Sequence, residues 1–211
     1  MRKCLLTVLL SAGLVFSSYA QIKVGIKAGA NFADFSDPVV PPGLEDISAM
    51  TTHWHAGLTA QQSLSDRFIL SSELLYSIKG FQEAPDFNVS TDIKTVLSLH
   101  YLSLPVLLNY QPIDKVSLGA GLELGYLMDA QVKMGDDKND VNFIYDKEFE
   151  LSLNLGFRFN ITPALFLDGR YQWGLSPVSE LVFTDPNGEP FEETSLKNRV
   201  LQVSIGYFII R

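Results

Sequence analysis

Apolar and polar residues alternate along most of this chain of 211 residues. In residues 149–161 every second residue is Phe, Leu or Ile, and the residues between them are polar or glycine. Successive side chains of a strand point to opposite faces, so this period of two predicts strands with one apolar and one polar face. The same pattern is found in seven other segments: 22–32, 52–63, 68–81, 98–111, 116–132, 165–176 and 199–210.

The connections between these eight segments alternate in length. Three are tight, near Ser65-Asp66, at 112–115 and at Thr162-Pro163. Four are long and rich in Asp, Glu, Pro and Gly: 33–51, 82–97, 133–148 and 177–198. Strands of ten residues or more, with long loops on one side and short turns on the other, are typical of transmembrane barrels. The sequence therefore predicts an all-β fold: a transmembrane antiparallel up-and-down β-barrel with eight strands, four long extracellular loops and three short periplasmic turns.

A soluble barrel would also alternate, but with its apolar face inward. An eight-stranded barrel has room inside for little more than packed side chains. The apolar faces carry bulky residues almost without interruption, whereas the polar faces carry many of the glycines, among them Gly29, Gly121 and Gly206. The small residues fit the small interior, so we expect the apolar faces to point outward into lipid.

The aromatic residues support this direction because they fall at two heights along the strands. Those expected near the loops are Trp54, Tyr76, Tyr126, Phe149, Tyr171 and Trp173, and those near the short turns are Phe68, Tyr110, Phe159 and Tyr207. Two aromatic belts around an aliphatic band match the two interfaces of a membrane.

The first residues have the features of a secretory signal peptide. A basic start is followed by an apolar run over 5–16 and by small residues ending at Ala20. We expect cleavage before Gln21, which gives a signal peptide over 1–20 and a barrel domain over 21–211. Cleavage also removes Cys4, so the mature protein would have no cysteine for disulfides or thiolate chemistry. Loss of the two basic residues takes the net charge from −8 to −10, which argues against a nucleic-acid partner.

Several charged residues have the parity of the barrel interior. The expected polar network contains Lys27, Glu73, Glu123, Arg158, Asp168 and Arg170, with further inward positions at Lys23, Lys79, Asp129 and Glu150. A three-residue turn at 162–164 would set Arg158 opposite Asp168 and Gly156 opposite Arg170, and the preceding hairpin would set Tyr101 opposite Gly125. Nearly equal numbers of both signs favour a salt-bridged plug over a selective pore. A proton or ion path along the same residues is the alternative.

Candidate metal and catalytic residues are few. His53 and His55 share a strand face, which suits chelation, but no acid completes the site and His100 has the opposite parity. The acidic stretch 135–140 does not have the residue spacing of a calcium-binding loop. Residues 185–189 are of the types that form turns. The sequence contains no G-x-S-x-G, Walker or H-E-x-x-H motif. We therefore expect no metal, no cofactor and no enzymatic activity.

Several segments, taken in order, resemble a known family. They are 25–32, 72–80, 101–105, 121–127, Arg170-Tyr171 and the final Gly206-Tyr207-Phe208. Together they are similar to the PorT-like outer-membrane β-barrel proteins of the Gram-negative envelope, over essentially the whole chain after the signal. One departure is the end of the chain, since such barrels usually end on an aromatic residue and here Ile209-Ile210-Arg211 follow Phe208.

The resemblance implies an integral outer-membrane protein. The family has no active site whose residues could be sought in this sequence, and the protein that gives the family its name is required for protein secretion. Our first expectation is a non-enzymatic barrel, with both termini periplasmic, whose loops contact envelope partners or ligands. The alternatives are an accessory part of a secretion system and a membrane-embedded hydrolase or small channel. The expected partners are outer-membrane lipid and envelope or secretion-system proteins.

Overall fold

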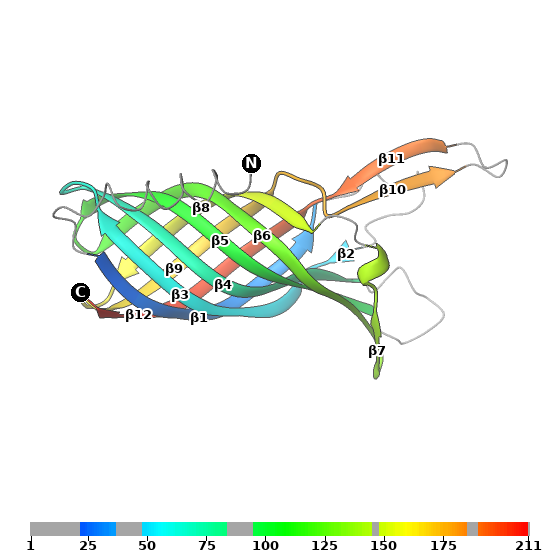
Figure 1. Cartoon of the computed structure of the whole chain (residues 1–211), viewed down its shortest axis with the longest axis horizontal. Helices are drawn as coiled ribbons and strands as arrows, with labels where there is room; N and C mark the ends of the chain where they lie inside the picture. The colour runs from blue at the N-terminus through cyan, green and yellow to red at the C-terminus, as the bar shows by residue number, and fades with distance from the viewer. Residues whose placement is uncertain (1–21, 37–47, 84–94, 145–147, 185–189, 211) are drawn as a thin grey trace, which may run out of the picture.

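Eight long antiparallel strands form one closed ring (Figure 1). The computed structural model describes residues 22–36, 48–83, 95–144, 148–184 and 190–210. The eight strands are β1 (Ile22–Phe35), β3 (Thr51–Ser63), β4 (Phe68–Glu83), β5 (Thr95–Ile113), β6 (Val116–Met134), β8 (Phe149–Asn160), β9 (Leu165–Gly174) and β12 (Asn198–Ile210). Their order around the ring is β4-β3-β1-β12-β9-β8-β6-β5, and the pairing of β5 with β4 closes it. The predicted eight-stranded up-and-down barrel is confirmed.

Short turns join the strands at one end of the barrel, which we call the turn end. Two of the turns are stabilised by a hydroxyl of the turn itself. The Ser65 hydroxyl accepts from the Phe68 N–H at 3.2 Å, and the Thr162 hydroxyl accepts from the Leu165 N–H at 2.9 Å. The third turn, between β5 and β6, holds Asp114 and Lys115. All three lie where the sequence predicts them.

The opposite end, which we call the loop end, carries further secondary structure (Figure 1). It comprises β2 (Ser48–Ala49), β7 (Asp137–Asp140), the 3-10 turn η1 (Asn142–Ile144), β10 (Ser179–Thr184) and β11 (Pro190–Leu196). β7 pairs with β6, while β10 and β11 form a hairpin of their own that projects from the barrel. The expected long connections 133–148 and 177–198 are therefore partly strand. Segments 37–47 and 84–94 of the other two lie outside the described residues, as does the expected signal peptide, which stays a prediction.

Side chains alternate in exposure along the strands as the barrel requires. On β5, Leu104 is 47% exposed on the outer wall, whereas the neighbouring inward residue Ser103 is fully buried. The glycines give the inward side chains their space: a Cβ at Gly206 would overlap the ring of Phe166, which points into the barrel. Among the described residues, no helix is long and apolar enough to cross a membrane.

Two expected positions in the β5–β6 hairpin differ from the prediction. Tyr101 pairs with Leu127 instead of Gly125, and Gly125 pairs with Ser103, in a register that runs unbroken from the pair Tyr110–Leu118 near the turn. Asp129 pairs with His100, on the outer wall, so the expectation that Asp129 points inward is wrong. The physical reason is a β-bulge: β6 has one extra residue between the pairs Tyr101–Leu127 and His100–Asp129, which reverses the parity of the strand beyond it. Tyr101 still covers Gly125, because a Cβ there would lie 3.1 Å from its ring.

Candidate functional site

Five charged residues meet in the middle of the lumen, and we call them the central cluster. They are Lys27 on β1, Glu73 on β4, Arg158 on β8, and Asp168 and Arg170 on β9. The Lys27 ammonium lies 2.8 Å from Asp168 and 3.2 Å from Glu73. Arg158 donates to Asp168 through Nε at 3.1 Å and Nη2 at 3.0 Å, and Arg170 donates to both Glu73 oxygens at 3.0 and 3.1 Å. The predicted pairing of Arg158 with Asp168 is confirmed.

A second group, the upper cluster, lies nearer the loop end. The Lys79 ammonium is 3.1 Å from Glu123 and 3.3 Å from Glu150. Glu150 also accepts from the Asn198 amide at 2.9 Å and from the Ser152 hydroxyl at 2.8 Å. Sequence analysis had placed Lys79 and Glu150 inward but had assigned them no partners.

The charges of the two clusters balance each other. In the central cluster three cations face two carboxylates, and in the upper cluster one cation faces two. Together they hold four charges of each sign, all of them in buried side chains. Buried charges are stable only when they are paired and hydrogen bonded. This lumen therefore has the electrostatics of a neutral plug and lacks the single dominant sign of an ion-selective path.

An apolar layer closes the lumen above the upper cluster. Its buried members are Phe35, Leu97, Leu99, Tyr101, Leu127, Ala130, Val178 and Leu196. The Lys79 ammonium lies 4.9 Å from the centre of the Tyr101 ring, so the layer rests directly on the upper cluster. The sequence pattern placed Tyr101 inward, but we predicted no apolar layer. The signal for this layer was present in the sequence, because Leu97, Leu99 and Tyr101 share the inward parity of Ser103.

His55 lies inside the barrel, where both of its ring nitrogens are engaged. Nδ1 is 2.8 Å from Asn31 Oδ1, and Nε2 is 2.8 Å from the Ser204 hydroxyl. Asn31 also donates to Ser77 at 2.9 Å. A ring bound on both sides cannot also bind a metal, so this geometry does not favour the pair His53 and His55 as chelators. No group of three potential metal-binding side chains is found in the part of the chain that the structure describes.

Ser204, His55 and Asn31 have the connectivity of a nucleophile, a base and an orienting group. Sequence reasoning missed this constellation because its members lie on three strands. All three are buried, with exposures of 3%, 1% and 0%. A hydrolase needs its nucleophile to be accessible to substrate, and this burial closes the Ser204 hydroxyl to solvent. We interpret the three as a structural hydrogen-bond network.

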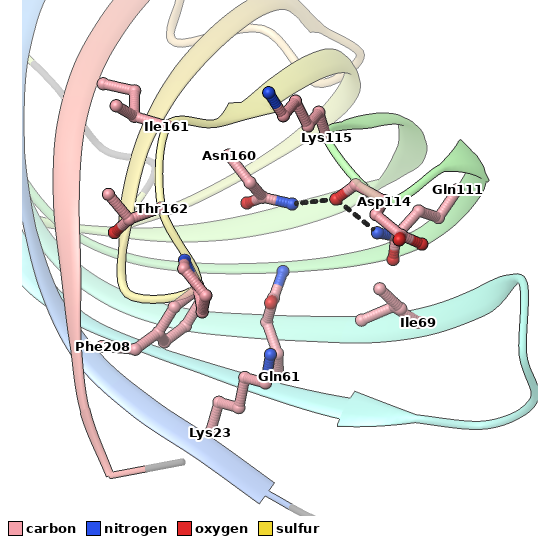
Figure 2. Close-up of a pocket in the computed structure, with 11 residues that line it drawn as sticks. Lys23, Gln61, Ile69, Gln111, Asp114, Lys115, Asn160, Ile161, Thr162 and Phe208 are labelled. Carbon is pink, nitrogen blue, oxygen red and sulfur yellow. Dashed lines mark hydrogen bonds between the residues drawn. The ribbon is translucent and has the colours of Figure 1, made fainter.

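A recess of about 410 Å³ opens at the turn end of the barrel (Figure 2). Figure 2 shows the Asn160 and Gln111 amides converging on the Asp114 carbonyl, to which they donate at 3.1 and 2.8 Å. Phe208 lines this recess and packs on Phe166 with ring centres 4.9 Å apart. The Arg158 guanidinium in turn lies 4.1 Å from the Phe166 ring. The recess therefore ends on the aromatic floor beneath the central cluster.

The expected belt residues lie on the outer wall and form cross-strand pairs. Near the loop end, Trp54 packs on Tyr76 at 5.4 Å and Tyr126 on Phe149 at 5.3 Å; near the turn end, Phe68 packs on Tyr110 at 5.5 Å. The other expected members, Phe159, Tyr171, Trp173 and Tyr207, also lie on the outer wall, where Tyr171 packs on Trp173 at 4.2 Å. Aromatic rings at two heights suit a wall that crosses two membrane interfaces.

Known structures share this architecture. Neisserial surface protein A aligns with 87% of this chain and 96% of its own, at 15% identity and a TM-score of 0.55. Ail, the attachment invasion locus protein of Yersinia pestis, aligns with 90% of this chain and 99% of its own, at 14% identity and a TM-score of 0.50. At such low identity the likeness concerns the fold alone.

Sequence comparison identifies the family. No curated protein sequence matches the chain. The family model for the outer membrane protein beta-barrel domain, however, matches residues 16–180, which is well over half of the chain. Together with the closed ring and the outward apolar wall, this match shows that the chain is integral to the outer membrane and belongs to the family named for its outer membrane protein beta-barrel domain.

Proposed function

We propose that this protein is a non-enzymatic and non-conducting barrel that anchors binding strands at its loop end. The observation that carries the proposal is the filled lumen. Two neutralising ionic clusters, an aromatic floor and an apolar layer follow one another along the barrel axis. An ion on this route would have to separate buried ion pairs and pass apolar side chains, both of which are costly.

Planar-bilayer recording tests the absence of conduction. The refolded barrel should give no steady current steps, while an open porin in the same lipid gives them. Regular conductance steps from the pure protein would contradict the proposal, because a neutral, packed interior offers no continuous water path.

A fluorophosphonate probe tests the absence of serine-hydrolase activity. Ser204 is the nucleophile-like residue of the buried network, and its hydroxyl already contacts His55. We expect no labelling of the folded barrel, with Ser204→Ala as the matched control. Labelling of the wild type that disappears in Ser204→Ala would contradict a purely structural network.

The loop end is the surface that we assign to binding. The β10–β11 hairpin extends beyond the barrel, and β6 continues past its last pair with β8 and there pairs with β7 (Figure 1). The Yersinia pestis barrel Ail has been solved with the heparin analogue sucrose octasulfate, so a barrel of this fold can hold a ligand.

Deletion of the hairpin tests this assignment. Residues 180–194 can be replaced by a short Gly-Ser turn, which leaves Val178 and Leu196 in the apolar layer. Crosslinked proteins recovered from outer membranes with the wild type should be lost with this variant, while a Gly-Ser substitution at the 64–67 turn should retain them. Equal recovery from both variants would contradict loop-end binding.

The alternative function is an accessory role in protein secretion, which would require a partner protein on the periplasmic side. It is supported by the PorT-like resemblance and by the polar recess at the turn end, which offers such a partner a place to dock. A chromosomal deletion should then lower the amount of secreted protein, and substitutions in the recess should reproduce that loss. Loss of secretion on removal of the β10–β11 hairpin alone would instead favour the loop end.

A further inference from the structure

A pocket of about 310 Å³ lies on the outer wall near the loop end, where β4, β5, β6 and β7 meet. Its volume is at the lower end of the range for small-ligand sites, about 300–1,000 Å³. The residues that line it are Ile78, Val96, Ser98, His100, Gln131, Lys133 and Lys138.

The pocket begins at the aromatic belt. His100 at its base contacts the belt residue Tyr76, with 2.5 Å between Nδ1 and the hydroxyl oxygen. Below this point the outer wall is apolar, with Leu102 and Met128 exposed. Tyrosine and tryptophan lie at the depth of lipid headgroups. The pocket therefore lies at headgroup depth and is continuous with the lipid-facing wall.

The polar groups of the pocket include three donors without acceptors. Lys133 and Lys138 are directly paired across β6 and β7, an arrangement of like charges that is unfavourable when nothing lies between them. Neither lysine has an ion pair among the residues that the structure describes. His100 Nε2 is buried and has no partner there. When the Tyr76 hydroxyl donates to Nδ1, the proton of the neutral ring lies on Nε2.

Two acids lie beside the pocket, because Asp129 pairs with His100 and Asp140 pairs with Gln131 across neighbouring strands. Asp129 accepts from the Gln131 amide at 2.6 Å and from the Asn142 amide at 3.0 Å. Asp140 accepts from the Asn142 N–H at 2.8 Å. These bonds engage both carboxylates with amide donors, and among the described residues neither acid forms an ion pair with Lys133 or Lys138.

We infer that this pocket binds the phosphate of a membrane-lipid headgroup in the leaflet at the loop end. Two ammonium groups and an imidazole N–H match the charge and the acceptor oxygens of a phosphate. Ile78 and Val96 supply apolar contacts for the adjoining part of the lipid. Basic pockets of membrane proteins bind lipid headgroups in this manner. The inference requires only the barrel in its membrane and is independent of the proposed function.

Native mass spectrometry of the barrel released from nanodiscs tests the inference. The nanodiscs contain phosphatidylcholine with a minor fraction of phosphatidic acid, the phosphomonoester probe. The test variant is Lys133→Gln with Lys138→Gln, and the charge-matched control is Arg67→Gln with Lys197→Gln, both outside the pocket. Folding of each variant is checked by its heat-dependent mobility on a gel.

The wild type and the control should retain phosphatidic acid in preference to phosphatidylcholine. The affinity should fall about five-fold for each lysine removed and about 25-fold for both. Equal retention by the double variant, or no preference in the wild type, would overturn the inference. Full displacement of the lipid by millimolar inorganic phosphate would assign the pocket to a soluble anion and would overturn the lipid assignment.

Discussion

The central cluster predicts that its carboxylates and its cations contribute unequally to stability. The wild type places Lys27, Arg158 and Arg170 around Glu73 and Asp168, an excess of one positive charge. Asp168→Asn leaves three cations around one carboxylate. Arg158→Gln instead leaves two charges of each sign, and the double substitution restores the original excess of one.

The magnitudes follow from these contacts. Removing one partner of a buried ion pair costs about 3–5 kcal/mol, and Asp168→Asn should reach the top of that range because Asp168 contacts all three cations. Arg158→Gln should cost about 1.5–3 kcal/mol, the range for lost hydrogen bonds to a charged group, because it leaves a balanced cluster. The double substitution should cost about 1–3 kcal/mol less than the sum of the two single changes.

Urea unfolding of barrels refolded in the same lipid measures these free energies. Lys27→Met is a useful fourth variant, because it also removes one cation and should behave like Arg158→Gln. Equal costs for Asp168→Asn and Arg158→Gln would refute the argument from charge excess. Strict additivity of the two would show that their ion pair contributes no coupling.

Three further predictions concern packing, topology and processing. Gly206→Ala should cost about 1–3 kcal/mol by urea unfolding, because its Cβ would overlap the Phe166 ring, whereas Gly169→Ala, with no atom within 4 Å of its Cβ, should be nearly neutral. Single cysteines in the long connections should react with an impermeant reagent on intact cells, and cysteines near Asp66 or Asp114 should not; the reverse pattern would invert the orientation. The connections to be tested are 33–51, 82–97, 136–140 and 185–193. Mass spectrometry of the outer-membrane form should find Gln21 as the first residue, and an intact Met1 would rule out the signal peptide.

Local alternation was sufficient to predict the barrel and the direction of its faces. Parity gave the inward position of Lys27 and Glu73 and the outward position of Trp54, because side chains of a strand alternate whatever lies across the lumen. Arg158 and Asp168 could be paired as well, since the tight turn at 162–164 fixes the register of its hairpin.

The same reasoning failed in the β5–β6 hairpin, although a tight turn joins these strands too. The register shifts between Tyr110 and Ile113, next to the turn, and Tyr101 lies opposite Leu127. A bulge farther along β6 moved Asp129 to the outer wall, and no residue type in that stretch marks the extra position. The apolar layer at the loop end could have been found from parity alone. It was missed because the inward residues were considered mainly for their charges.

The sequence by itself determined that the chain forms a barrel with an apolar wall and charges inside, because both follow from a period of two within single strands. Only the tertiary structure decided which charges meet. Lys27 reaches Asp168 over a sequence separation of 141 residues, and Arg170 reaches Glu73 over 97. His55 likewise joins Asn31 to Ser204. The contacts of Lys27 with Asp168, Arg170 with Glu73 and His55 with Ser204 join strands that do not pair with each other. They therefore depend on how the closed ring staggers its strands, and that stagger belongs to no single hairpin.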